Sequence, residues 1–335
     1  MKTTNIFYVV VLMSGICLAT ACKKSAVNDG GNGSTNTDLQ TQSDDQDQVS
    51  SEDEAITNDV NTALYSQASI AGNDAISQGS GQTTTLGTEQ TNGAGQPITG
   101  IICDATIVVD KDSDPRTITI TYNGQECWGH RTRQGVVVIS IPANEHWADK
   151  GATVSISIQN LKITRLRDKK SITINGTKSI TNQSGGLLVN LATLGTITHT
   201  IAGDLSITFD SGKQRVWSVS KQRVFSYDNG IVITTTGTHT DSLGNTNVAE
   251  WGTNRFGVGF ESLISQPKVI RQDCDFQLTG GQNTILRTDK YTSVITYGLD
   301  ANGNPTSCPG ASGTYYFKVV VTTPAGLTYT FILPY

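Results

Sequence analysis

Three carboxylates at alternate positions of one turn are the first residues whose spacing could support chemistry. Asp110, Asp112 and Asp114 lie in an Asp-Lys-Asp-Ser-Asp stretch. Carboxylate oxygens are the ligands that Ca²⁺ prefers, so the turn is a candidate metal site. Pro115 and Arg116 follow, where a helical calcium-binding loop continues with a glycine and a more distant glutamate. That departure favours a solvated acidic turn.

Basic side chains crowd a second turn. Arg165, Arg167, Lys169 and Lys170 occur within six residues. Such a cluster could bind a phosphate or an acidic glycan. It would equally suit a charged hairpin tip, which prevents strands of neighbouring molecules from pairing. Both interpretations stay open from the sequence.

An aromatic residue next to a cationic group forms a third candidate. Trp128 precedes His130 and Arg131 by two and three positions. An exposed indole ring with polar neighbours could stack on a sugar ring. In a β-rich protein a tryptophan is more often part of the core. Both interpretations stay open from the sequence, a glycan-binding site and a tryptophan of the core.

No sequence motif specifies a reaction. The nucleophile elbow, the zinc-protease helix, the phosphate-binding loop and the dinucleotide-binding glycine pattern are all absent from the sequence. Acidic residues are scattered over the predicted strands and turns, so a pair of carboxylates for glycoside hydrolysis stays open. The sequence therefore favours a non-catalytic role without a cofactor.

The cysteines predict a disulfide framework. Four cysteines lie beyond the N-terminal region, and four allow three pairings. Cys103 and Cys127 flank one predicted hairpin, and Cys274 and Cys308 flank a later one, which favours those two pairs. Disulfides are expected if the protein is exported. The cysteine spacing and the four histidines do not form a zinc-ligand pattern.

Period-two alternation of apolar and polar residues runs through residues 99–335. In the segment 117–122, for example, Ile118, Ile120 and Tyr122 alternate with threonines. This pattern predicts antiparallel strands with one apolar face. We expect an all-β fold, an antiparallel meander that closes as a sandwich, a jelly roll or a strongly curved sheet. One domain, or two packed halves that divide at residues 185–195, are both compatible with the sequence.

Turns are expected between these strands wherever a residue tolerates positive φ. Asn-Gly and related pairs have this property. They occur at residues 123–124, 175–176, 211–212, 228–230, 280–281, 302–303 and 325–326. About a dozen strands result, with no long helix after residue 99.

Charge is distributed unevenly along the chain. The total is 24 basic and 29 acidic residues, a net charge of −5. Residues 1–60 contain three lysines and nine acids, so their net charge is −6 and that of the remainder is +1. The body therefore lacks the basic surface that binds nucleic acid.

The segment 22–98 has few apolar residues and an acidic run. A segment of this composition cannot bury enough apolar surface to offset the entropy of ordering, so it predicts a largely disordered tether. Ile56, Val60 and Leu64 recur at helical spacing. They predict one short helix over residues 52–76.

The N-terminus carries a targeting signal. Met1-Lys2 precedes an apolar run over residues 6–21, which is shorter than the ~20 residues of a membrane span. Leu18-Ala19-Thr20-Ala21-Cys22 resembles the lipobox of bacterial lipoproteins, of the Bacteroidota type. The resemblance implies a signal peptide at residues 1–21 and a diacylated, palmitate-type anchor on Cys22. Two or more acyl chains provide stable membrane attachment.

These features together predict a lipid-anchored protein of the cell envelope, at the outer membrane. Its non-catalytic β body would bind a ligand, a glycan or an envelope protein, or serve structurally. One alternative is an exported hydrolase that acts on polysaccharide through paired carboxylates. Another is a carrier for lipid or lipoprotein with an apolar cavity.

Overall fold

The computed structural model describes residues 36–72, 98–99, 102–125, 129–274, 276–308 and 314–335. Residues 36–335 form one compact unit rather than two halves. The predicted signal peptide, Cys22, Cys127 and Trp128 lie outside the described residues.

Two helices precede a long series of strands, with three short helical turns between strands or at their ends. The elements are α1 (Asn36–Tyr65), α2 (Ala68–Ala71), β1 (Ile98–Thr99), β2 (Ala105–Asp110), β3 (Arg116–Gln125), β4 (Arg131–Ile141), β5 (Thr153–Arg165), β6 (Ser171–Asn182), η1 (Leu188–Asn190), α3 (Leu191–Leu194), β7 (Thr196–Phe209), β8 (Gln214–Tyr227), β9 (Ile231–Gly237), β10 (Val248–Thr253), β11 (Gly259–Arg271), η2 (Gln272–Cys274), β12 (Gln277–Arg287), β13 (Thr292–Leu299), β14 (Tyr316–Thr322) and β15 (Thr328–Pro334).

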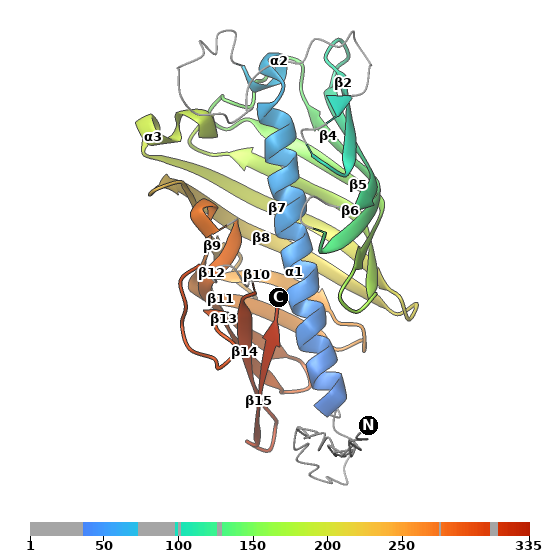
Figure 1. The fold of residues 1–335 in the computed structure, drawn as a ribbon, viewed down its shortest axis with the longest axis vertical. Helices are drawn as coiled ribbons and strands as arrows, with labels where there is room; N and C mark the ends of the chain where they lie inside the picture. The colour runs from blue at the N-terminus through green and yellow to red at the C-terminus, as the bar shows by residue number, and fades with distance from the viewer. Residues whose placement is uncertain (1–35, 73–97, 100–101, 126–128, 275, 309–313) are drawn as a thin grey trace, which may run out of the picture. The chain divides into compact units, whose positions relative to one another are not determined.

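The strands form one antiparallel sheet of 15 strands, which confirms the predicted all-β meander. Neighbours in the sheet follow the chain order, except that β9 and β10 both lie between β8 and β11 and pair with each of them. Of the three predicted ways to bury the apolar face, the structure has the strongly curved sheet (Figure 1). The short η1 and α3 occupy the connection from β6 to β7, at the place where the sequence allowed a division into two halves.

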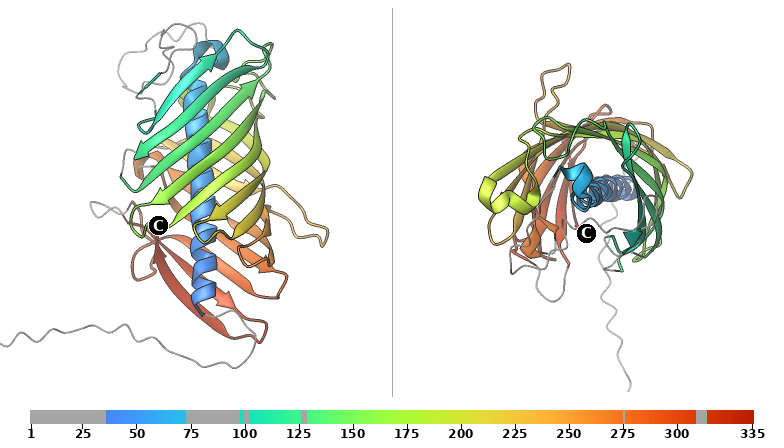
Figure 2. Two further views of the ribbon diagram at one scale, coloured as in Figure 1. Left: turned by 90° about the vertical axis from the view of Figure 1, so that its right-hand side faces the viewer. Right: turned by 90° about the horizontal axis from the view of Figure 1, so that it is seen from above.

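The concave face of the sheet encloses α1, as Figure 2 shows along and across the helix. The prediction of a disordered tether is therefore wrong for residues 36–72, and the helix begins at Asn36 instead of Glu52; residues 73–97 of the predicted tether lie outside the described residues. Within its 30 residues α1 has eight acids and no lysine or arginine. Judged by itself, such a segment has too little apolar surface to fold. The concave face of the sheet supplies the apolar contacts and the opposite charges that the segment lacks by itself.

Most of the apolar residues that α1 contributes to the core lie in its C-terminal half. Ile56, Val60 and Leu64 are completely buried and join one cluster with the inward residues of the strands. The backbone N–H of Trp147 donates to the carbonyl of Ile70 in α2, with 2.9 Å between N and O. This end of the helix is therefore held mainly by hydrophobic packing, whereas the N-terminal half contributes Leu39 and Val49 to the same core.

Some of the predicted turns lie inside strands. The Asn-Gly and Gly-Gly pairs at 123–124, 175–176 and 280–281 belong to β3, β6 and β12, so those turn predictions are wrong. Gly176 has φ +138°, and a Cβ atom there would lie 2.3 Å from the carbonyl oxygen of Asp204 in β7. Glycine thus permits close approach of strands where the sheet bends. The turns at 211–212, 228–230, 302–303 and 325–326 are confirmed.

One predicted disulfide is present. Cys274 in η2 is bonded to Cys308, with 5.0 Å between their Cα atoms. Cys103 is also disulfide-bonded, and its predicted partner Cys127 is not among the described residues. The pairing of Cys103 with Cys127 therefore stays a prediction.

Candidate functional site

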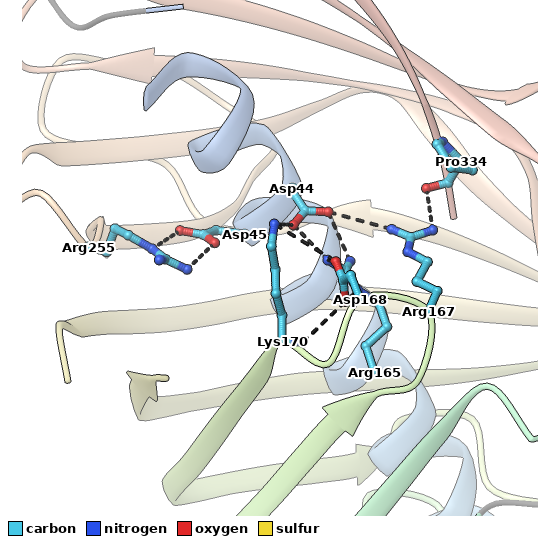
Figure 3. Close-up of polar contacts among 8 residues, drawn as sticks. All are labelled: Asp44, Asp45, Arg165, Arg167, Asp168, Lys170, Arg255 and Pro334. Atoms are coloured by element: carbon cyan, nitrogen blue, oxygen red, sulfur yellow. Dashed lines mark hydrogen bonds and ion pairs between the residues drawn. The ribbon is translucent and has the colours of Figure 1, made fainter. Parts of the chain in front are cut away.

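The basic turn predicted from the sequence faces the acidic helix. Arg165 donates two hydrogen bonds to the Asp44 carboxylate, at 2.9 and 2.7 Å, and the ammonium of Lys170 lies 2.9 Å from the same group. The Arg167 guanidinium is 3.6 Å from Asp44 and also donates to the carbonyl of Pro334 (Figure 3). Burial would raise the pKa of Asp44, but the bonds from Arg165 and Lys170 outweigh it and lower the pKa. The anion that this turn binds is a side chain of the protein itself.

A second group of ion pairs lies at the middle of α1 and is fully enclosed. Lys178 of β6 binds Asp53 and donates to Thr57, and Lys221 of β8 lies 3.5 Å from Asp53. Lys221 is also 2.8 Å from Glu250 of β10. Burial raises the pKa of Glu250, but Lys221 and Lys268 outweigh it and lower the pKa to about 2. These charges are therefore ionised inside the protein because each has an opposite charge beside it.

The second predicted binding cluster is also partly engaged by the helix. Arg131 lies 2.7 Å from Glu52, and it is the strand partner of Arg165 at the same end of the β4–β5 hairpin. The backbone carbonyl of His130 accepts a bond from the N–H of Leu166. The structure thus joins two clusters that are more than 30 residues apart in the sequence. Lys169 is exposed in the turn beside them.

A cavity of about 510 Å³ opens beside these residues. Such a volume lies in the range of small-molecule sites, ~300–1,000 Å³. One wall is the central part of α1, the second is the end of the β4–β5 hairpin, and the third comes from the strands β9 and β11–β13 with the C-terminus. The residues that line it are Asp47, Gln48, Ser50, Ser51, Glu52, Glu54, Ala55, Asn58, His130, Arg131, Arg165, Arg167, Thr235, Lys268, Ile270, Phe276, Gln277, Leu278, Tyr297, Thr314 and Tyr335.

Several buried polar groups of this lining have unused hydrogen-bonding capacity. Gln48 Nε2, Thr235 Oγ1 and the Tyr297 hydroxyl have no hydrogen-bond partner among the described residues. Each of these side chains is at least nine-tenths buried. Buried polar groups are normally paired, so a concentration of unpaired ones at one cavity marks a place for a polar ligand or for water.

Two ionisable groups of the lining are strongly perturbed. Burial raises the pKa of Asp47 to about 7, and Lys268 opposes that rise. Burial lowers the pKa of Lys268 to about 8, and Glu250 opposes that fall. Perturbed groups in a cavity are typical of functional sites. Neither residue was predicted from the sequence, although Lys268 lies on the same face of its strand as the buried Ile270.

Replacement of Asp47 tests its raised pKa, because that pKa makes the free energy of unfolding depend on pH. Between about pH 4 and pH 7 the unfolded chain releases a proton that folded Asp47 retains, so this group lowers stability as the pH rises. We expect Asp47→Asn to raise the free energy of unfolding by roughly 2–4 kcal/mol at pH 8 and to change it little at pH 4. Urea denaturation at both pH values measures this, with the exposed Asp112→Asn as control. A variant less stable than wild type at pH 8 would show that Asp47 has an ionic partner in solution.

The acidic turn does not gather its carboxylates around one point. Asp110 accepts bonds from Asp112 N and from Ser113, whereas Asp114 accepts a bond from Ala143 N in another loop. The one set of potential metal ligands in the described part of the chain is Asp273 with Cys274 and Cys308, whose sulfurs form the disulfide. This arrangement favours the interpretation of residues 110–114 as a solvated turn.

Comparison with known protein families, with curated proteins and with solved structures gave no match to this chain. The chemistry of the site therefore rests on its geometry. A rigid cavity with a buried cation, a buried carboxylate and unpaired hydroxyl and amide groups is suited to bind a small polar molecule.

Proposed function

We propose that this chain is an exported, lipid-anchored protein of the cell envelope, at the outer membrane, whose β body binds a small polar ligand. The observation that carries the binding role is the cavity beside α1, with its buried and unpaired Gln48, Thr235 and Tyr297. The N-terminal resemblance to bacterial lipoproteins supports the anchor. Ion pairs along α1 support the same role, because they hold one wall of the cavity rigid before any ligand arrives.

The position of α1 limits the reach of such an anchored body. Only 13 residues separate Cys22 from Asn36, where the helix begins. A chain of that length spans at most ~50 Å. No helix in the described ranges is long and apolar enough to cross a membrane. An anchor on Cys22 would therefore keep the ligand-binding body within ~50 Å of the bilayer surface.

The anchor makes a specific prediction about Cys22. We expect the mature protein to begin at residue 22, with a mass increase that matches acylation, and to incorporate labelled palmitate. Cys22→Ser should abolish the label and move the protein from the detergent phase to the aqueous phase, because the acyl chains provide the membrane affinity. Mass spectrometry of the N-terminal peptide measures the first result. A mature chain that retains residues 1–21 would contradict the anchor.

Ligand binding is tested by thermal shift with a panel of sugars, sugar acids and other small polar metabolites. We expect at least one class to raise the melting temperature of the wild type. Ala55→Trp, which fills the cavity from α1, should remove the shift, whereas Ala202→Trp on the exposed face of β7 should retain it. No shift with any compound, or shifts that Ala55→Trp leaves intact, would contradict binding in this cavity.

One observation favours a second candidate function, hydrolysis of polysaccharide. Asp47 has a pKa raised to about 7 by burial, as a general acid needs, and Glu52 lines the same cavity. Glu52 is held by Arg131 at 2.7 Å, which limits its use as a base or nucleophile. Release of reducing sugar by the wild type, abolished in Asp47→Asn, would establish hydrolysis. The charged helix in the concave face argues against the third possibility, a carrier with a large apolar hollow.

A further inference from the structure

We propose that the cavity is selective for a hydroxylated monocarboxylate of monosaccharide size, such as a hexuronic acid, with its carboxylate at Lys268 and its hydroxyl groups at Asp47. The proposal rests on the binding function above and names the ligand class. It differs from the expectation of an anion at the exposed basic turn, because that turn is engaged by Asp44.

Among the described residues no carboxylate contacts the buried Lys268 directly; Ser50, its hydrogen-bond partner, donates in turn to Glu250. Its side chain is nine-tenths or more buried, and within the described part of the chain no carboxylate oxygen lies within 4.0 Å of its ammonium. Its one hydrogen bond goes to Ser50 Oγ, at 2.9 Å. An ammonium has three donors, so two are available. A buried charge is costly unless it is paired, and a bound anion would supply the pair.

The neighbours of Lys268 are hydrogen-bond donors. Thr235 of β9 is its partner in the sheet register. The ammonium lies 5.1 Å from the centre of the Tyr297 ring, whose hydroxyl is unpaired. Gln48, on α1 two residues before Ser50, has an unpaired amide nitrogen in the same cavity. Together with Lys268 these groups can donate to both oxygens of a carboxylate.

The acidic residues of the cavity decide between kinds of anion. The arginines of the lining are paired with Glu52 and Asp44, whereas the acidic groups that act on Lys268 itself are Glu250 and Asp47. Their negative charge opposes a phosphate ester, which carries −1.5 to −2 near neutral pH, more than a carboxylate of charge −1. Asp47 can accept hydrogen bonds from hydroxyl groups. A ligand with one carboxylate and several hydroxyls therefore fits both parts of the site.

The third wall of the cavity supplies apolar contacts for the body of the ligand. Ile270, Leu278 and Phe276 line it together with Tyr335. The Tyr335 hydroxyl donates to the Leu278 carbonyl and accepts a bond from Gly298 N, so this ring has a defined position. Fixed aromatic and aliphatic side chains suit the C–H face of a sugar ring. The volume of about 510 Å³ leaves room for one such ring.

Calorimetric titration of the full chain tests the assignment with three probes built on the same sugar ring: glucuronate, methyl glucoside and glucose 6-phosphate. We expect glucuronate to bind at least tenfold more tightly than either of the others. Lys268→Met should weaken glucuronate at least tenfold, and the exposed Lys162→Met should leave it unchanged. Methionine has a similar shape and no charge, so Lys268→Met should fold. Thr235→Val and Tyr297→Phe test the same anion site by removing one hydroxyl donor each.

Each remaining outcome decides against the assignment in a different way. Equal binding of methyl glucoside, or preference for glucose 6-phosphate, would overturn the monocarboxylate while leaving a cavity that binds ligands. Glucuronate binding that persists in Lys268→Met, Thr235→Val and Tyr297→Phe would place the anion elsewhere. Failure of all three probes overturns the ligand class; failure also of the wider panel in the thermal-shift experiment overturns the binding function itself.

Discussion

Deletion of residues 36–71 is expected to prevent the sheet from folding. This change removes α1 and α2, so the cations of the concave face lose the carboxylates that the helix supplies. Lys178, Lys221 and Arg223 are completely or almost completely buried, and their carboxylate partners include Asp53 and Glu54 of the helix. Several unpaired buried charges, each costing several kcal/mol, exceed the ~5–15 kcal/mol by which a domain is stable.

Thermal unfolding followed by tryptophan fluorescence measures this result. Trp147 and Trp217 are fully buried in the wild type and report on the interior. A chain that begins at residue 36 is the matched control and should unfold cooperatively, because it retains every described contact of the helix. Supplying residues 36–71 as a separate peptide should restore part of the folded population. A cooperative transition of the deleted chain alone, near the wild-type temperature, would show that the helix is an accessory.

Asp53→Asn is expected to be the most damaging single substitution in the charged interior. Asp53 binds Lys178 and lies 3.5 Å from Lys221, and all three side chains are at most 1% exposed. Burial would raise the pKa of Asp53, but Lys178 and Lys221 outweigh it and lower the pKa, so the group is ionised. Removal of one member of a buried pair leaves an uncompensated charge and costs ~3–5 kcal/mol. Urea denaturation at pH 7 measures the loss.

Two controls separate the lost charge from the lost contact. Asp53→Leu combined with Lys178→Met removes both members, and we expect it to recover most of the stability lost in Asp53→Asn. Asp228→Asn breaks an exposed pair with Arg271, in which Asp228 is 66% exposed, and should cost less than ~1 kcal/mol. If Asp53→Asn lowers the free energy of unfolding no more than Asp228→Asn does, the charged interior is hydrated.

The strands could be read from the sequence because their signal is local. In β7, Leu205, Ile207 and Phe209 are buried and the residues between them are not, as the alternation predicts. The turns were read with less success. Gly176 and Gly281 have positive φ like turn glycines, but they lie where one strand closely approaches the next. A glycine pair indicates permitted backbone angles, and only the curvature of the sheet decides how they are used.

The acidic helix could not be read in the same way, although a signal for it exists. In β8 the buried phase is Arg215, Trp217, Val219, Lys221, Arg223 and Phe225. Basic residues in the apolar phase of a strand must find buried partners. That pattern predicts an internal source of negative charge, and the chain contains one acidic run long enough to supply it. Likewise, only part of the candidate site could be predicted from the sequence. The sequence indicated His130, Arg131, Arg165 and Arg167 as binding residues, but it gave no sign of Asp47 and Lys268.

By itself, the sequence determined the class of fold, the Cys274–Cys308 bridge and the places where basic residues gather, because strand periodicity and residue spacing act over a few neighbouring residues. Only the tertiary structure decided that the acidic segment is an interior helix, which carboxylate each cation meets, and where a cavity remains. Those outcomes depend on pairs such as Asp53 and Lys178, 125 residues apart, whose charges interact strongly only after the curved sheet has excluded water from both.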